Sequence, residues 1–162
     1  MCIAQITAKM IAYFDGDVRR VNHALKVYGF ASAIARLENI KGQMLDVIDI
    51  AAVLHDIGIV NAEKKYNSSA GNYQEVEGPP VAKALLEEYN LSEALVERIC
   101  FLIGNHHSYD KIDGVDFQIL VEADFLVNIF EDNMSKNAID SIRKKYIKTT
   151  AGKTIFDQLY AT

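Results

Sequence analysis

A nearly unbroken apolar run from Met44 to Leu54 ends directly on a histidine and an aspartate, His55 and Asp56. The run predicts a helix that is buried on most of its sides. An imidazole and a carboxylate at the end of such a helix lose their hydration, which costs free energy unless another group compensates. A metal ion is a common compensator when further His and Asp side chains converge on the same point. The pair therefore predicts a buried polar site.

Composition limits the classes of protein that this chain can belong to. Its 162 residues, half of them apolar, are enough for one domain with a full core. The net charge of −5 argues against a protein that binds nucleic acid or an anionic membrane through its overall charge. No apolar stretch reaches about 18 residues, so we expect no transmembrane helix. Cys2 and Cys100 predict no disulfide, which favours a cytoplasmic protein.

Apolar residues recur at helical spacing along the chain, and strand-like alternation is absent. The sequence therefore predicts an all-α fold, a single-domain helical bundle. The expected helices cover residues 3–14, 17–38, 44–58, 79–89, 92–106, 116–130, 137–149 and 154–160, with Ile119, Leu120, Ala123, Val127 and Phe130 of the 116–130 helix facing inward.

Local signals place several helix ends. Asp17 and Ser92 are good N-caps for the helices that follow them. Pro79-Pro80 permits a helix start, because proline is tolerated in a first turn. Residues 60–78 are polar, and we expect a flexible loop within them at 67–72.

Two further polar residues interrupt apolar helical patterns elsewhere in the chain. His23 borders the apolar face of its predicted helix, and Asp124 is embedded in the apolar surface of another. Each residue alone has an ordinary explanation, as a hydrogen-bonded histidine or as a carboxylate that caps a helix or pairs with lysine or arginine. Together with His55 and Asp56 in a chain of this size, they favour one shared site.

The chain resembles the HD superfamily of metal-dependent phosphohydrolases, the HD domain. The similarity lies in the ordered set of His23, Leu54-His55-Asp56-Ile57-Gly58 and Glu122-Ala123-Asp124. It covers roughly residues 17–131, and we expect helices within 132–162 to complete one HD-type domain across 1–162. The resemblance implies a helical bundle in which four side chains bind one divalent cation. These four are His23, His55, Asp56 and Asp124.

The donor set agrees with a transition metal. Two neutral imidazoles and two carboxylates suit Mn, Fe, Co, Ni or Zn better than Mg, which prefers oxygen ligands and retained water. We expect one ion, with open positions for water and a substrate oxygen. A metal-activated water would then attack phosphorus. His55 and Asp56 are the expected catalytic residues, with Asp56 in reach to orient the water.

Other residues extend this expected site. Some family members bind two ions through additional histidines, and here His106, His107, Glu75 or Glu77 could serve a second ion or the substrate. A polar helix end is the alternative explanation for the two histidines.

Two basic residues flank His23. Arg19 lies one helical turn before it, on the same side of the helix, and is expected to bind a substrate phosphate. Lys26, on the next turn, is a further candidate. A charged surface face that keeps the protein in solution is the alternative for both residues.

The sequence therefore predicts a phosphohydrolase that cleaves a phosphomonoester or phosphodiester of a nucleotide or related small metabolite. A non-catalytic HD module that senses a metal or nucleotide is one alternative. A di-iron oxygenase on the same scaffold is another, although it needs a fuller second set of ligands. The expected partner is a phosphorylated small molecule, and a homodimer is compatible with the sequence.

Overall fold

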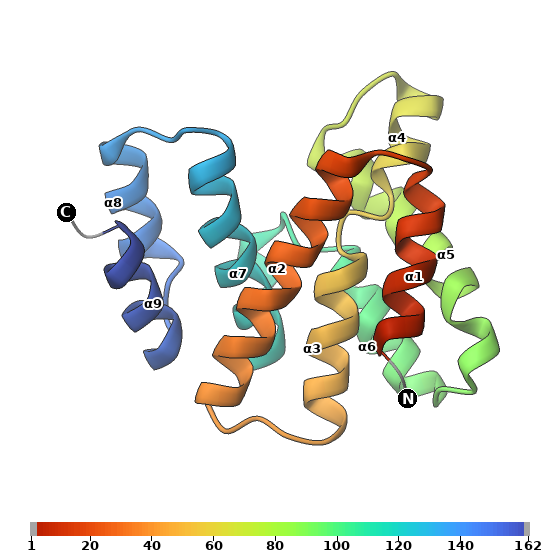
Figure 1. The fold of residues 1–162 in the computed structure, drawn as a ribbon, viewed down its shortest axis with the longest axis horizontal. Coiled ribbons are helices and arrows are strands. Elements are labelled where there is room, and N and C mark those ends of the chain that lie inside the picture. The colour runs from red at the N-terminus through yellow and green to blue at the C-terminus, as the bar shows by residue number, and fades with distance from the viewer. Residues whose placement is uncertain (1–2, 161–162) are drawn as a thin grey trace.

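The computed structural model describes residues 3–160, so the prediction for Cys2 lies outside the described residues. This range is helical and contains no strand, which confirms the all-α prediction (Figure 1). The helices are α1 (Ile3–Phe14), α2 (Val18–Leu37), α3 (Gln43–Leu54), α4 (Ile59–Tyr66), α5 (Gly71–Leu86), α6 (Glu93–Ile103), α7 (Val115–Glu131), α8 (Lys136–Lys145) and α9 (Thr150–Tyr160), with short 3-10 turns η1 (Glu87–Tyr89) and η2 (Tyr109–Lys111). Within this range, no helix has the length and apolar character needed to cross a bilayer.

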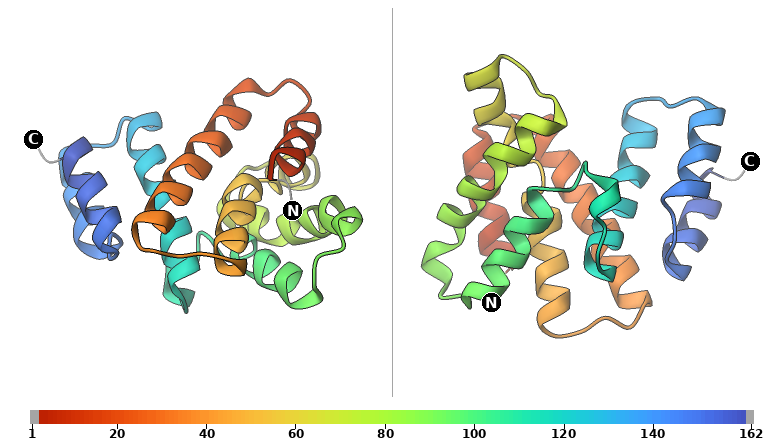
Figure 2. Two further views of the ribbon diagram at one scale, coloured as in Figure 1. Left: turned by 60° about the horizontal axis from the view of Figure 1, so that its bottom comes forward. Right: turned by 180° about the vertical axis from the view of Figure 1, so that it is seen from behind.

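Three helices, α2, α3 and α7, form the centre of the bundle (Figure 1). α1 and α6 pack on α3, and α5 packs on α6 and α4. α9 packs on α7 and α2, with α8 beside it. Both views in Figure 2 show the α8–α9 pair at the opposite end of the molecule from α4 and α5.

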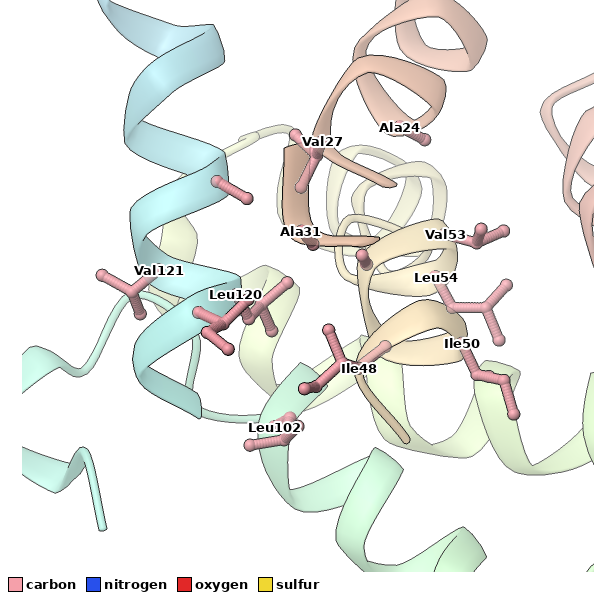
Figure 3. Close-up of a cluster of buried hydrophobic side chains, with 14 of the residues drawn as sticks. Ala24, Val27, Ala31, Ile48, Ile50, Val53, Leu54, Leu102, Leu120 and Val121 are labelled. Atoms are coloured by element: carbon pink, nitrogen blue, oxygen red, sulfur yellow. The ribbon is translucent and has the colours of Figure 1, made fainter. Parts of the chain in front are cut away.

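The core joins these central helices through apolar side chains. Figure 3 shows Val27 and Ala31 of α2, Ile48 of α3, Leu102 of α6 and Leu120 of α7 in one cluster. All five are essentially inaccessible to solvent. Each large aliphatic side chain buried in this way contributes about 1.5–3 kcal/mol. This packing holds α2, α3 and α7 against one another.

Several helix ends follow the sequence signals and others do not. Asp17 accepts a hydrogen bond from the Arg20 backbone N–H, and Ser92 accepts one from Leu95, so both predicted caps are confirmed. The third helix ends at Leu54, four residues earlier than expected, because residues 55–58 form a turn.

The proline prediction is wrong. α5 begins at Gly71, so Pro79 and Pro80 lie inside the helix and not at its start, and the polar segment 60–78 is largely helical. The reason is close tertiary packing, which overrides a local signal. A Cβ on Gly58 would lie only 2.5 Å from the Gly78 nitrogen, so the turn after α3 sits directly on the α5 backbone.

The C-terminal part of the bundle also differs in detail. Phe130 is 78% exposed, which corrects the prediction that it faces inward; the buried residue at that end of α7 is Ile129. The last helices begin at Lys136 and Thr150. Buried Glu122 accepts hydrogen bonds from the backbone N–H groups of Lys148 and Thr149, which holds the turn between these helices against α7.

Candidate metal centre

Four side chains from distant parts of the sequence meet at one point. His23 comes from α2, His55 and Asp56 from the turn after α3, and Asp124 from the middle of α7. His23 Nε2 lies 3.1 Å from His55 Nε2, 3.3 Å from Asp124 Oδ1 and 3.6 Å from Asp56 Oδ2. His55 Nε2 lies 3.5 Å from Asp56 Oδ2 and 3.7 Å from Asp124 Oδ1. Two imidazoles and two carboxylates therefore face the same small volume.

The hydrogen bonds of the two imidazoles show which nitrogen is free. His55 Nδ1 lies 2.9 Å from the Ala52 carbonyl oxygen, which can only accept, so His55 carries its proton on Nδ1. His23 Nδ1 lies 2.9 Å from a carboxylate oxygen of Glu131 and must also donate. When both rings are neutral, two Nε2 lone pairs face each other at 3.1 Å. Such an arrangement is repulsive without a cation between them, and it fits a divalent metal.

The pKa shifts of the clustered residues also indicate that the site favours an added positive charge. Burial alone lowers the pKa of His23, but hydrogen bonding and attraction from Asp124, with Asp56 and Glu131, outweigh it and raise the pKa to about 9. Burial lowers the pKa of His55 and keeps it neutral. Burial works against charge on Asp56 too, yet its pKa is lowered because the histidines around it favour the carboxylate. The cluster thus attracts one positive charge, which either a proton or a metal ion can supply.

A second set of ligand atoms shares Asp56. His106 Nε2 lies 3.2 Å from Asp56 Oδ1, on the carboxylate oxygen that does not face His23. One ligand atom from each of Asp56, His106 and His107 lies within 4.8 Å of the others. Burial, together with the charge of His106, lowers the pKa of His107 to about 4, so its ring is neutral near pH 7. The structure thus brings His106 and His107 next to the first four residues.

The two glutamates proposed for a second ion are engaged elsewhere. Glu75 accepts hydrogen bonds from the His107 backbone N–H at 3.0 Å and from the Ser108 hydroxyl at 3.1 Å, so it supports the histidine segment. Glu77 is paired with Lys65 at 2.6 Å and accepts a hydrogen bond from the Tyr66 hydroxyl. Glu77 is also absent from the lining of the cleft described next.

A cleft of about 610 Å³ opens onto the cluster. Its floor includes His23, Asp56 and Asp124, and its wall includes Arg19. Within residues 3–160, the Arg19 guanidinium makes no hydrogen bond or ion pair, so it is available to a ligand. Lys26 is not available in this way, because its ammonium group is bonded to Glu131.

Some residues of the site were not recognised from the sequence. Glu131 and Asn128 both line the cleft, and Glu131 also contacts His23 and Lys26. The available signal for Glu131 was its spacing, since it follows Asp124 by two helical turns and therefore lies on the same face of α7. Asn128 lies in a pattern that resembles an ordinary helix surface.

An all-α bundle with this donor set at the floor of a cleft defines a helical protein with a candidate metal site. A family model for the HD domain matches residues 20–149, and the chain belongs to the HD domain family. Members of this family are metal-dependent hydrolases, and they bind divalent metals.

A solved structure has a similar fold. It is the crystal structure of a predicted HD superfamily hydrolase from an uncultured Thermotogales bacterium. The alignment covers 98% of this chain and 83% of that one, with 22% sequence identity and a TM-score of 0.68. No curated protein sequence matches the chain significantly.

Proposed function

We propose that this protein is a metal-dependent phosphohydrolase that cleaves a phosphomonoester or phosphodiester of a nucleotide or related small metabolite. The observation that carries the proposal is the convergence of two Nε2 lone pairs and two carboxylates at the floor of an open cleft. His23, His55, Asp56 and Asp124 would hold the ion. These four ligands would leave coordination positions on a six-coordinate ion for water and a substrate oxygen.

A bound divalent cation would supply two effects, a more acidic water molecule and neutralisation of charge on the phosphoryl group. The chain's own residues would do the rest. Arg19 lines the cleft, and its guanidinium would bind two phosphate oxygens at once. Asp56, which presents one oxygen toward His23 and the other toward His106, would accept a hydrogen bond from the attacking water and orient it. The buried floor would limit access of other water molecules to the reacting atoms.

The alternatives differ from this proposal in what would be measured. A sensing module would bind metal and nucleotide without turnover. A di-iron oxygenase would contain two iron atoms per chain and consume oxygen. Asp56, His106 and His107 could hold a second ion, so the proposal allows either one or two metal ions per chain. Metal analysis of the purified protein would determine the number.

The test begins with metal analysis of the purified protein, followed by a phosphate-release screen. The panel should contain nucleoside monophosphates, cyclic nucleotides and dinucleotides, sugar phosphates and aryl phosphates. We expect a chelator to abolish release and a transition metal to restore it. Asp56→Ala should abolish release while the helical circular dichroism spectrum persists. Asp46→Ala, which removes an exposed aspartate from the first turn of the same α3, is the matched control and should retain activity. Release that survives both chelation and Asp56→Ala would refute the proposal.

A further inference from the structure

The imidazoles around Asp56 are held in two different ways. His55 Nδ1 donates to the Ala52 carbonyl at 2.9 Å, and His106 Nδ1 donates to the Ile103 carbonyl at 2.8 Å. Both acceptors are neutral backbone groups three residues earlier in the chain. His23 is different, because its Nδ1 faces the carboxylate of Glu131 at 2.9 Å.

This carboxylate comes from the same helix as a proposed metal ligand. Glu131 follows Asp124 by seven residues, or about two turns of α7, so both side chains lie on one face. Asp124 Oδ1 reaches His23 Nε2 at 3.3 Å, while Glu131 Oε2 reaches Nδ1 of the same ring. α7 therefore brings a carboxylate close to each of the two nitrogens of His23.

The second oxygen of Glu131 is also occupied. It accepts a hydrogen bond from Lys26, which lies three residues after His23 on α2. The Glu131 side chain is only 15% exposed, and its carboxylate forms an ion pair with the Lys26 ammonium group. Glu131 is thus a fixed, charged acceptor between two residues of α2.

We propose that Glu131 is a positioning residue for the metal centre. It fixes the proton of His23 on Nδ1, sets the orientation of the ring and strengthens Nε2 as an electron donor to the ion. A charged acceptor does this more strongly than the carbonyls that hold His55 and His106. Lys26 anchors Glu131 and does not bind the substrate phosphate. The inference rests on the metal centre of the proposed function and is independent of the substrate.

Metal affinity provides the first test. The affinity for Zn²⁺ would be measured by competition with a chromophoric chelator in the wild type, Glu131→Gln and Glu131→Ala. We expect Glu131→Ala to bind about 10- to 100-fold more weakly, as is typical when the outer partner of a metal-binding histidine is removed. Glu131→Gln should be intermediate, because its amide oxygen can still accept from Nδ1 but carries no charge.

The matched control is Asp132→Asn, which removes the same charge from the adjacent residue of the cleft wall without touching His23. If Glu131 acts through its contact with His23, this variant should change Zn²⁺ affinity much less than Glu131→Gln. An equal loss of affinity in both variants would show that only the overall negative charge of the cleft affects metal binding, and it would overturn the proposal. Wild-type affinity in Glu131→Ala would also overturn it.

A second readout separates positioning from a merely structural role. In the Zn²⁺-loaded protein, NMR of the imidazole nitrogens should show a slowly exchanging Nδ1 proton on His23, shifted downfield by the carboxylate. Glu131→Ala should lose this signal, while the corresponding His55 signal remains. Retention of the His23 signal in that variant would contradict the assignment. A wild type that binds Zn²⁺ with these graded losses but releases no phosphate would refute the proposed function and leave this inference standing.

Discussion

The Nε2 atoms of His23 and His55 face each other at 3.1 Å, although His23 lies in α2 and His55 in the turn after α3. Each ring is turned to this position by an acceptor on its Nδ1. Neither nitrogen can satisfy the other when both rings are neutral. The pair is therefore stable only with a positive charge between them, and the first prediction below tests this directly.

The first prediction concerns stabilisation by metal. An ion that binds only the folded state stabilises it by about 2.7 kcal/mol when its free concentration is 100 times Kd. We expect Mn²⁺ or Zn²⁺ to raise the melting temperature of the wild type in a concentration-dependent way. His55→Ala should abolish the increase, because it removes a fully buried ligand. The measurement is differential scanning fluorimetry with and without a chelator, and an increase that persists in His55→Ala would contradict the proposed ligand set.

A second prediction concerns Arg19. Its guanidinium lines the cleft without a partner among residues 3–160, so Arg19→Ala should mainly weaken substrate binding. Loss of a charge-assisted contact of about 1.5–3 kcal/mol corresponds to a rise in KM of about 10- to 100-fold. Arg19→Lys should be intermediate, since it retains charge but not the two-pronged geometry. Lys64→Ala, which removes an exposed cation from α4 outside the cleft lining, is the control. Unchanged kinetics in Arg19→Ala would assign this residue to the solvated surface.

A third prediction concerns the attachment of the C-terminal helices. A Cβ on Gly152 would lie 1.9 Å from Glu122 Oε2 and 2.6 Å from Thr149 Oγ1. Gly152→Ala should therefore break the buried hydrogen bonds of Glu122 and lower the free energy of unfolding by about 2–4 kcal/mol. Gly29→Ala is the matched control, since nothing lies within 4 Å of a Cβ there. That variant should be more stable by about 0.5–1 kcal/mol, because alanine favours a helix. Urea unfolding measures both, and equal stabilities would rule out the contact as a constraint.

The fourth prediction is a pH dependence far from the cleft. Asp49 is buried in α3, and its Oδ1 has no hydrogen-bond partner in the described chain. Burial raises its pKa. An acid with a higher pKa in the folded state stabilises the fold at low pH, and this contribution is lost as pH rises through the folded-state pKa. The stability of Asp49→Asn relative to the wild type should therefore increase as pH rises from below the ordinary pKa of an aspartate to neutrality. The measurement is urea unfolding of both metal-free proteins at several pH values across this range. A stability difference that does not change with pH would disprove the explanation.

The parts of the fold that follow from local patterns were predictable from the sequence. Apolar spacing identifies the buried α3, and the polar residues that interrupt such patterns identify His23 and Asp124. The errors arose where long-range packing decides the outcome. The backbone of Gly58 packs closely on α5, and the helix continues through both prolines; no local signal indicates this contact.

The same limit applies to charged residues of the site. Lys26 and Glu77 have the right chemistry for a phosphate or a metal, but their partners, Glu131 and Lys65, were not evident from the linear order. Spacing along one helix can show which side chains share a face. It cannot show whether a residue of a neighbouring helix already forms an ion pair with one of these side chains.

The proposed donors for the ion come from α2, from the turn directly after α3 and from α7, and α2, α3 and α7 form the centre of the bundle. A nascent or misfolded chain cannot assemble them, because no short segment carries more than two. Metal occupancy would therefore report correct folding. A chain that fails to bring its middle and late helices together would not bind the ion.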